Sequence, residues 1–153
     1  MALGTRGVNK TNDQKEFRAR RFSSGEKGKV CRHGFTRLDL TASDSAAGVF
    51  TWQNPNPFNC NVVRVILYVS NEATGACTVD IGTTSSVASS DNLLDGVDVG
   101  TAVAVFDNVD ATDQGTSGRS QRLLTQGSYV TGSVASGASA GLEGSVVIEW
   151  VEG

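Results

Sequence analysis

Residues 61–70, NVVRVILYVS, decide the fold that this sequence predicts. Alternate positions in this stretch are aliphatic: Val63, Val65, Leu67 and Val69. A period of two places these four side chains on the same face of a β-strand. Burying each side chain contributes roughly 1.5–3 kcal/mol, so we expect this face to lie against a core.

The opposite face of the same strand is mixed, and it carries Val62, Arg64, Ile66, Tyr68 and Ser70. The Arg64 guanidinium must reach water, a carboxylate or a neighbouring chain, because an unpaired buried charge is strongly destabilising. Two interpretations remain open. Either the Arg64 stem covers Val62 and Ile66 on its own sheet, or Arg64, Ile66 and Tyr68 form an oligomer interface, where arginine and tyrosine are favoured.

Other short stretches with apolar alternation flank this strand. They cover residues 35–42, 48–53, 77–81, 101–106, 119–124, 128–134 and 145–151. The Asn-Pro-Asn-Pro run at residues 54–57 predicts a corner, and residues 71–75 predict a hairpin turn that joins 61–70 to 77–81. About eight short strands with long loops predict an all-β fold, a single β-sandwich of the jelly-roll type.

Charge divides the chain into two parts. Residues 1–37 hold ten Lys/Arg and three acids, a net charge of +7, and the remaining residues hold three Lys/Arg and 13 acids, a net charge of −10. A basic terminal segment on an acidic body is typical of an interaction tail. We therefore expect an extended, flexible basic N-terminal arm over residues 1–34 and the β-sandwich body over residues 35–153.

The arm has too few apolar residues to fold alone. Residues 11–22 have the pattern of a short helix that forms on a partner, with Phe17 and Phe22 as apolar anchors. The expected docking residues are Lys15, Phe17, Arg18, Arg20, Arg21, Phe22, Lys27 and Lys29. The basic residues suit either an acidic protein surface or the phosphates of a nucleic acid.

The sequence does not predict an enzyme or a cofactor. His33 is the single histidine, so any Ser-His-Asp or Cys-His catalyst would depend on a residue at the root of the arm. Cys31 and His33 lack a second Cys/His pair at zinc-binding spacing. Three cysteines do not form a disulfide framework, and we expect free thiols. No stretch approaches the ~18 apolar residues of a membrane span.

Two other patterns have a structural and a functional interpretation. Asp91, Asp95 and Asp98, together with Asp80, could gather around calcium, but their spacing is not that of an EF-hand, and aspartates in loops more often bond their own backbone. Trp52 and Trp150 could form a sugar platform, but both are in phase with apolar strand neighbours, which favours core packing.

Several stretches of the body resemble small jelly-roll-like structural proteins of tailed phages. They are Ala73-Thr74-Gly75-Ala76, Ser90-Asp91-Asn92-Leu93-Leu94-Asp95-Gly96-Val97-Asp98-Val99-Gly100, Val105-Phe106-Asp107-Asn108 and Tyr129-Val130-Thr131-Gly132-Ser133. Such proteins decorate or cement capsids. The resemblance covers residues 50–151 and implies a virion location, self-association, often as trimers, and an arm that lies on the capsid shell.

The expected function is that of a non-enzymatic decoration protein on the outer capsid surface, made in the host cytoplasm. Its expected partners are the major capsid protein and other copies of itself, as a trimer. One alternative is a self-assembling jelly-roll coat protein whose basic arm binds nucleic acid. Another is a glycan- or receptor-binding virion module that uses Trp52, Tyr68 or Tyr129.

Overall fold

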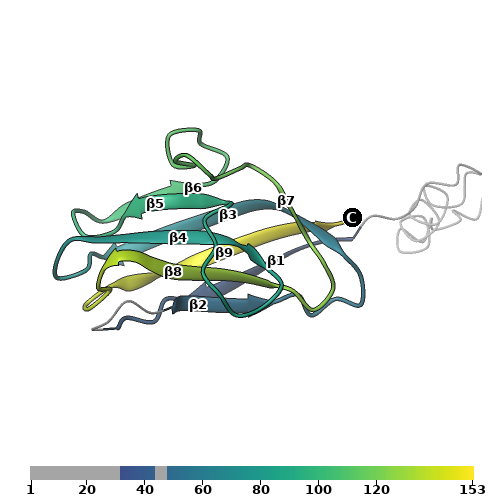
Figure 1. The fold of residues 1–153 in the computed structure, drawn as a ribbon, viewed down its shortest axis with the longest axis horizontal. Helices are drawn as coiled ribbons and strands as arrows, with labels where there is room; N and C mark the ends of the chain where they lie inside the picture. Colours follow the sequence, from purple (N-terminus) through teal and green to yellow (C-terminus); the bar gives the residue numbers. More distant parts are fainter. Residues whose placement is uncertain (1–31, 44–47) are drawn as a thin grey trace, which may run out of the picture. The chain divides into compact units, whose positions relative to one another are not determined.

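The structure is a computed structural model that describes residues 32–43 and 48–153. The described residues form nine β-strands (Figure 1). The strands are β1 (His33–Asp39), β2 (Gly48–Gln53), β3 (Cys60–Asn71), β4 (Cys77–Thr84), β5 (Leu94–Asp98), β6 (Ala104–Asp107), β7 (Arg122–Leu124), β8 (Tyr129–Gly137) and β9 (Glu143–Glu152).

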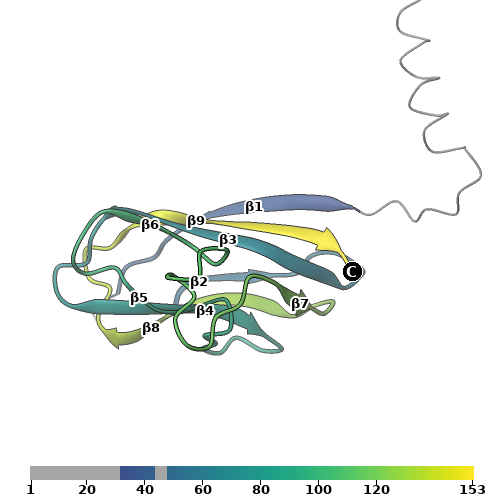
Figure 2. The same cartoon turned by 90° about the horizontal axis from the view of Figure 1, so that it is seen from above.

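The strands form two antiparallel sheets, which Figure 2 shows as two layers of the body. Sheet I has the order β1-β9-β3-β6, and β7 also pairs with β3; sheet II has the order β2-β8-β4-β5. The chain passes repeatedly from one sheet to the other, so that most neighbours within a sheet are distant in sequence; β4 and β5 are consecutive strands that pair. This connectivity is that of a jelly roll. The predicted all-β sandwich is therefore confirmed.

The core lies between the two sheets and contains the side chains that the alternation predicts. Val65, Leu67 and Val69 on β3 are fully buried, as are Val79 and Ile81 on β4. From β2, Phe50 and Trp52 enter the same core with less than a tenth of their surface exposed. Sheet II covers these β3 side chains and so accounts for the apolar face of residues 61–70.

The start of β3 differs from the prediction. Between Val62 and Arg64 the pairing of β3 with β9 shifts by one residue, a β-bulge that leaves Val63 as the extra residue. Val62 is fully buried and Val63 is only half-buried. The bulge thus exchanges their expected positions, because one additional residue reverses which side chains face the core.

Asn108 bridges a second interruption, on the other side of β3 from the bulge. β3 pairs with β7 at residues 60–62 and with β6 at residues 66–69, and Asn108 fills the interval between them. Its Oδ1 accepts a hydrogen bond from Val65 N at 2.5 Å, and its Nδ2 donates to the carbonyls of Arg119 and Ser120, each at 3.1 Å. This fully buried side chain thus takes the place of the backbone groups with which a neighbouring strand would bond β3.

One connection, one strand and one strand boundary also differ from expectation. Residues 72–76 carry the chain from sheet I to sheet II, so β3 and β4 do not form the predicted hairpin. The reason is that Ala73 N and Thr74 N donate to Val99 O and Ala140 O, which lie outside β3 and β4. Residues 93–99, to which the sequence assigned no strand, contain β5, and the strand expected over residues 35–42 ends at Asp39.

Two glycines are required by close packing and turn geometry. Gly34 on β1 lies beneath the Trp150 ring, and a Cβ there would be 2.5 Å from a ring carbon. Gly127 has a φ of 74° in the turn from β7 to β8, where its backbone conformation disfavours other residues. These positions fix β1 against β9 and direct β8 into the second sheet.

Candidate interaction surface

The outer face of sheet I is assembled from alternate residues of four strands. On β3 the buried Val65, Leu67 and Val69 alternate with Arg64, Ile66 and Tyr68, which therefore point away from the core. The strand register places their cross-strand neighbours on the same face. These neighbours are Glu149, Val147 and Ser145 on β9, Asp107 and Val105 on β6, and Phe35, Arg37 and Asp39 on β1.

This face exposes large apolar side chains. Phe35 is 74% exposed, Tyr68 47% and Val105 57%. Leu123 on β7 is 56% exposed, next to the buried Leu124 that marks the inner side of that strand. Tyr68 and Val105 are direct cross-strand partners, so their apolar surfaces adjoin. Exposed apolar side chains that cluster on one face are typical of interaction surfaces.

Arg64 has a carboxylate partner within the chain. Its Nε donates to Asp107 Oδ2 at 2.9 Å, and its Nη2 donates to the same oxygen. The Asp107 hydrogen bond, followed by its charge, raises the pKa of the Arg64 guanidinium. The Arg64 side chain is still 47% exposed. Arg64, Ile66 and Tyr68, predicted together from the sequence, thus lie in one row on the outer face of sheet I.

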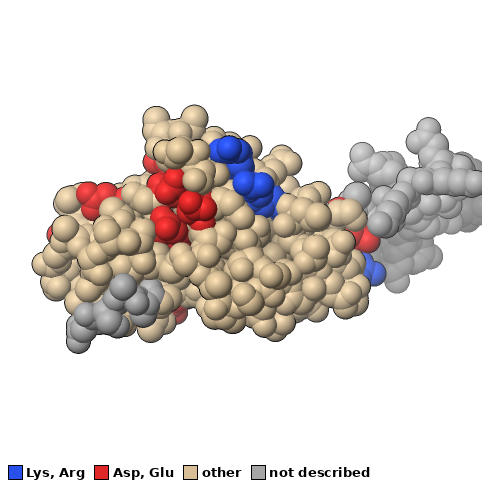
Figure 3. All heavy atoms as spheres, viewed as in Figure 1, with Lys and Arg blue, Asp and Glu red and all other residues tan. Residues whose placement is uncertain are grey.

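The outer face of sheet II is different in character. Figure 3 shows a group of acidic side chains on the face that carries β4 and β5, beside a smaller basic group. Asp80 lies near Asp91 and Asp95 there. Burial raises the pKa of the Asp80 carboxyl, and the two neighbouring carboxylates raise it further, against the hydrogen bond from Gly96 N.

Two of the aspartates considered for calcium, Asp95 and Asp98, accept hydrogen bonds from the backbone. Asp95 Oδ2 accepts from Thr116 N and Ser117 N in a later loop, and Asp98 Oδ1 accepts from Gly100 N two residues on. Of these, the Asp98 contact is the local turn that the sequence favoured. Among the described residues, no three His, Cys, Asp or Glu side chains are grouped so that they could hold a metal ion.

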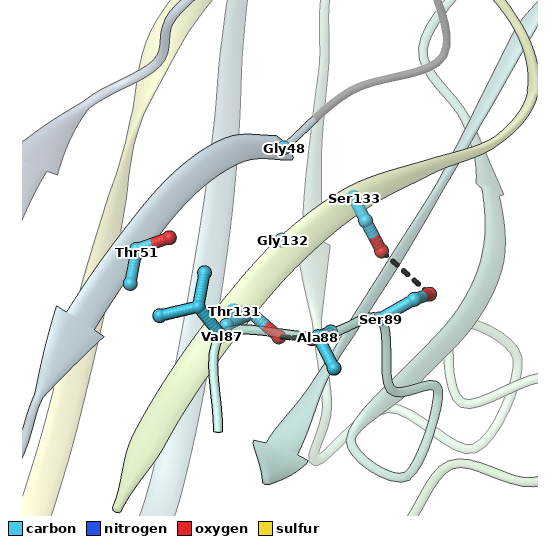
Figure 4. Close-up of a pocket in the computed structure, with 8 residues that line it drawn as sticks. All are labelled: Gly48, Thr51, Val87, Ala88, Ser89, Thr131, Gly132 and Ser133. Atoms are coloured by element: carbon cyan, nitrogen blue, oxygen red, sulfur yellow. Dashed lines mark hydrogen bonds between the residues drawn. The ribbon is translucent and has the colours of Figure 1, made fainter.

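A shallow pocket lies where residues 87–89 cross the outer face of sheet II (Figure 4). It has a volume of about 200 Å³ and is lined by Val87, Ala88 and glycine, serine and threonine residues of β2, β8 and the loop. Ser89 and Ser133 bond each other at 2.8 Å, and Thr131 donates to Ala88 O. The pocket is smaller than the ~300–1,000 Å³ of typical small-ligand sites.

The aromatic residues considered for sugar binding do not form a platform. Trp52 is buried in the core, which confirms the packing interpretation. Trp150 packs partly against the core, and its ring centroid lies 6.2 Å from that of Phe58. Tyr129 is half-buried at the end of β8, on sheet II, whereas Tyr68 is exposed on sheet I. Tyr68 is thus the one residue of the proposed sugar set that the described structure exposes.

The remaining candidates are the docking residues of the arm, the single histidine and the cysteines. All eight expected docking residues, from Lys15 to Lys29, lie outside the described residues, as does Cys31. His33 begins β1, and its Nε2 lies 2.7 Å from Glu149 Oε1. Cys60 and Cys77 are buried free thiols, and burial raises the pKa of each. No helix in the described ranges is long and apolar enough to cross a membrane.

Most of the outer face of sheet I was not predicted from the sequence. Phe35 has the parity of Arg37 and Asp39, which alternate with the apolar Leu38 and Leu40, so its outward position could have been recognised from residues 35–40. Val105, Val147 and Leu123 could not, because their place beside Tyr68 and Ile66 depends on a strand register that no single stretch reveals.

A chain of one capsid structure is similar to this chain, at low sequence identity. No protein-family model matches the chain, and no curated protein matches it. The chain is similar to one in the acidic stable capsid structure of Helicobacter pylori bacteriophage KHP30, with 15% sequence identity and a TM-score of 0.46. The match covers 80% of this chain and 93% of the other.

Proposed function

We propose that this chain is a non-enzymatic virion structural protein that binds the outer surface of a phage capsid as a decoration protein. The observation that carries the proposal is the division of the chain: a basic segment with a net charge of +7 over residues 1–37 precedes an acidic β-sandwich. A charged arm supplies attraction and orientation toward an oppositely charged surface. The resemblance of residues 50–151 to small phage structural proteins supports the same role.

The outer face of sheet I is the proposed surface for self-association, as a trimer. Arg64, Ile66 and Tyr68 are aligned on it, and Phe35 and Val105 extend its apolar area across the sheet. Arginine and tyrosine are the residue types that most often dominate protein–protein binding. Copies that are linked in this way bring several arms to one shell, so that weak individual contacts produce strong retention.

Binding to expanded phage heads that lack the protein tests the proposal. The full chain should sediment with heads, and Arg18→Ser/Arg20→Ser should reduce the bound fraction severalfold. Arg6→Ser/Lys10→Ser is the matched control. It removes the same charge from the arm but leaves the expected docking residues intact, so it should bind heads more strongly than Arg18→Ser/Arg20→Ser does. Equal binding by both variants and the wild type would contradict docking by the arm.

The same experiment separates the coat-protein alternative, which the arm's charge also suits. A coat protein would form shells without heads, or its arm would bind any DNA or RNA with an affinity that falls steeply with salt. A decoration protein remains a small oligomer and requires the head. Spontaneous shells, or nucleic-acid binding that Arg18→Ser/Arg20→Ser abolishes while head binding persists, would assign the arm to the genome instead.

A further inference from the structure

β1 is an open edge of sheet I in the described part of the chain, and it differs from the other edges. It pairs with β9 at seven successive positions without a register shift. The pairings of the sheet II edge strands β2 and β5 are each interrupted by a bulge, and β6 and β7 have only four and three residues. Bulges and short length are common devices that prevent edge strands from pairing with other chains. β1 lacks both.

The direction of the free backbone groups on β1 follows from its bonds to β9. Leu40 N donates to Gly144 O, and Arg32 O accepts from Glu152 N. Backbone groups alternate in direction along a strand, so even-numbered residues point toward β9. The N–H and C=O groups of His33, Phe35, Arg37 and Asp39 therefore point toward the open edge.

These four residues are self-complementary in one antiparallel register. With a two-fold axis at Thr36, residue 33 faces residue 39 of a second copy, and residue 35 faces residue 37. His33 then lies opposite Asp39, and the Phe35 ring lies opposite the Arg37 guanidinium, a cation–π pair. All four residues form hydrogen-bonded pairs, about eight bonds in total. A shift of two residues places Arg37 opposite Arg37 or Phe35 opposite Phe35 and leaves one of the four unpaired within β1.

We infer that β1 pairs with β1 of a second copy about a two-fold axis at Thr36, which joins two copies of sheet I into one continuous sheet. The partner is thus the chain itself, recognised by β-strand addition. Edge pairing extends the sheet sideways and leaves Arg64, Ile66 and Tyr68 uncovered, so this contact shares Phe35 with the trimer proposed above but uses different central residues. It also does not depend on the proposed capsid role.

Proline at residue 37 tests the contact selectively. Arg37 N–H points away from β9, so Arg37→Pro removes no bond within the sheet and is compatible with an edge strand. The variant should melt like the wild type but lose the two-fold association in sedimentation, with a dissociation constant raised at least about tenfold. Thr51→Pro is the matched control: β2 is an edge strand of sheet II, and Thr51 N–H points away from β8, because Asn54 N three residues on bonds Ser128 O. This variant should keep the two-fold association.

Cysteine cross-linking tests the register itself, in a Cys31→Ser background. Phe35→Cys and Arg37→Cys chains should form a disulfide dimer when they are mixed, because hydrogen-bonded pairs have Cα atoms about 5.5 Å apart. Each variant alone should not, because residue 35 and its own copy are diagonal neighbours. Absence of the mixed dimer, equal cross-linking of the single variants, or unchanged association of Arg37→Pro would overturn the inference, whatever the outcome of head binding.

Discussion

Arg64 shows how one residue satisfies a mixed strand face. The sequence required a partner for its guanidinium, and Asp107 on the adjacent β6 provides one. An ion pair at this exposure contributes little to stability, because water and salt screen it. The pair also orients the Arg64 side chain beside the Tyr68–Val105 pair, which remains exposed. The first interpretation from the sequence is wrong for Val62, which the bulge places in the core and not under the Arg64 stem, and the interface interpretation stays a prediction.

Arg64→Ala should yield a folded protein that no longer forms the proposed trimer at micromolar concentration. Folding survives because the lost ion pair is exposed. Association is lost because an arginine in the middle of an interface makes a large share of its contacts. Thermal melting measures the first effect and sedimentation velocity the second.

Tyr68→Phe is the matched control for this face. It keeps the ring that adjoins Val105 and removes only the hydroxyl, so it should retain more of the association than Arg64→Ala. If the wild type is already a monomer, or if Arg64→Ala keeps the wild-type oligomer, the trimer interface lies elsewhere on the molecule.

Among the elements, β3 provides the sharpest difference between sequence and structure. Strict alternation over residues 61–70 predicts that Val63 is in the core and that Val62 is outside it. The bulge reverses these positions. We therefore predict that Val62→Ala lowers the free energy of unfolding by about 2 kcal/mol, because it removes buried methyl groups and leaves a cavity. Urea unfolding followed by fluorescence measures the change.

Val63→Ala is the matched control, since it deletes the same atoms one residue away. Its half-buried side chain should contribute about 1 kcal/mol or less. The reverse order, with Val63→Ala more destabilising than Val62→Ala, would mean that β3 runs without the bulge and that the simple alternation holds to its first residue.

The extent of successful prediction follows from how local each feature is. Core residues such as Leu67, Ile81 and Trp52 were recognised because period-two alternation reports burial within a single stretch. The β3–β4 connection was predicted wrongly because a five-residue turn suits either a hairpin or a crossing between sheets. Hydrogen bonds from Ala73 N and Thr74 N to distant loops decide between them, and no local pattern encodes these bonds.

For the molecule as a whole, the charge division separates two tasks. In the described body the core is built from strands of both sheets, and the contacts between the start of β1 and β9 begin at Arg32 and Glu152. Nine of the 13 Lys/Arg residues lie before β1, whereas 13 of the 16 Asp/Glu residues lie in the body. With such a division, substitutions in the arm can change attachment without changing the stability of the sandwich.

Removal of residues 1–31 should therefore leave the cooperative melt of the body within a few degrees of the wild type while head binding is lost. The cut preserves Arg32, which lies over the Phe58 ring at 5.2 Å and whose carbonyl bonds Glu152 N.

Removal of residues 1–40 is the contrasting variant. It takes away all of β1, together with Leu38 and Leu40 that pack against the core, and it exposes the backbone of β9 along seven paired positions. Calorimetry should show a broad or much lower transition for this variant only. If the shorter deletion also loses its cooperative transition, the basic segment is part of the folded body, and the proposed separation of arm and sandwich is wrong.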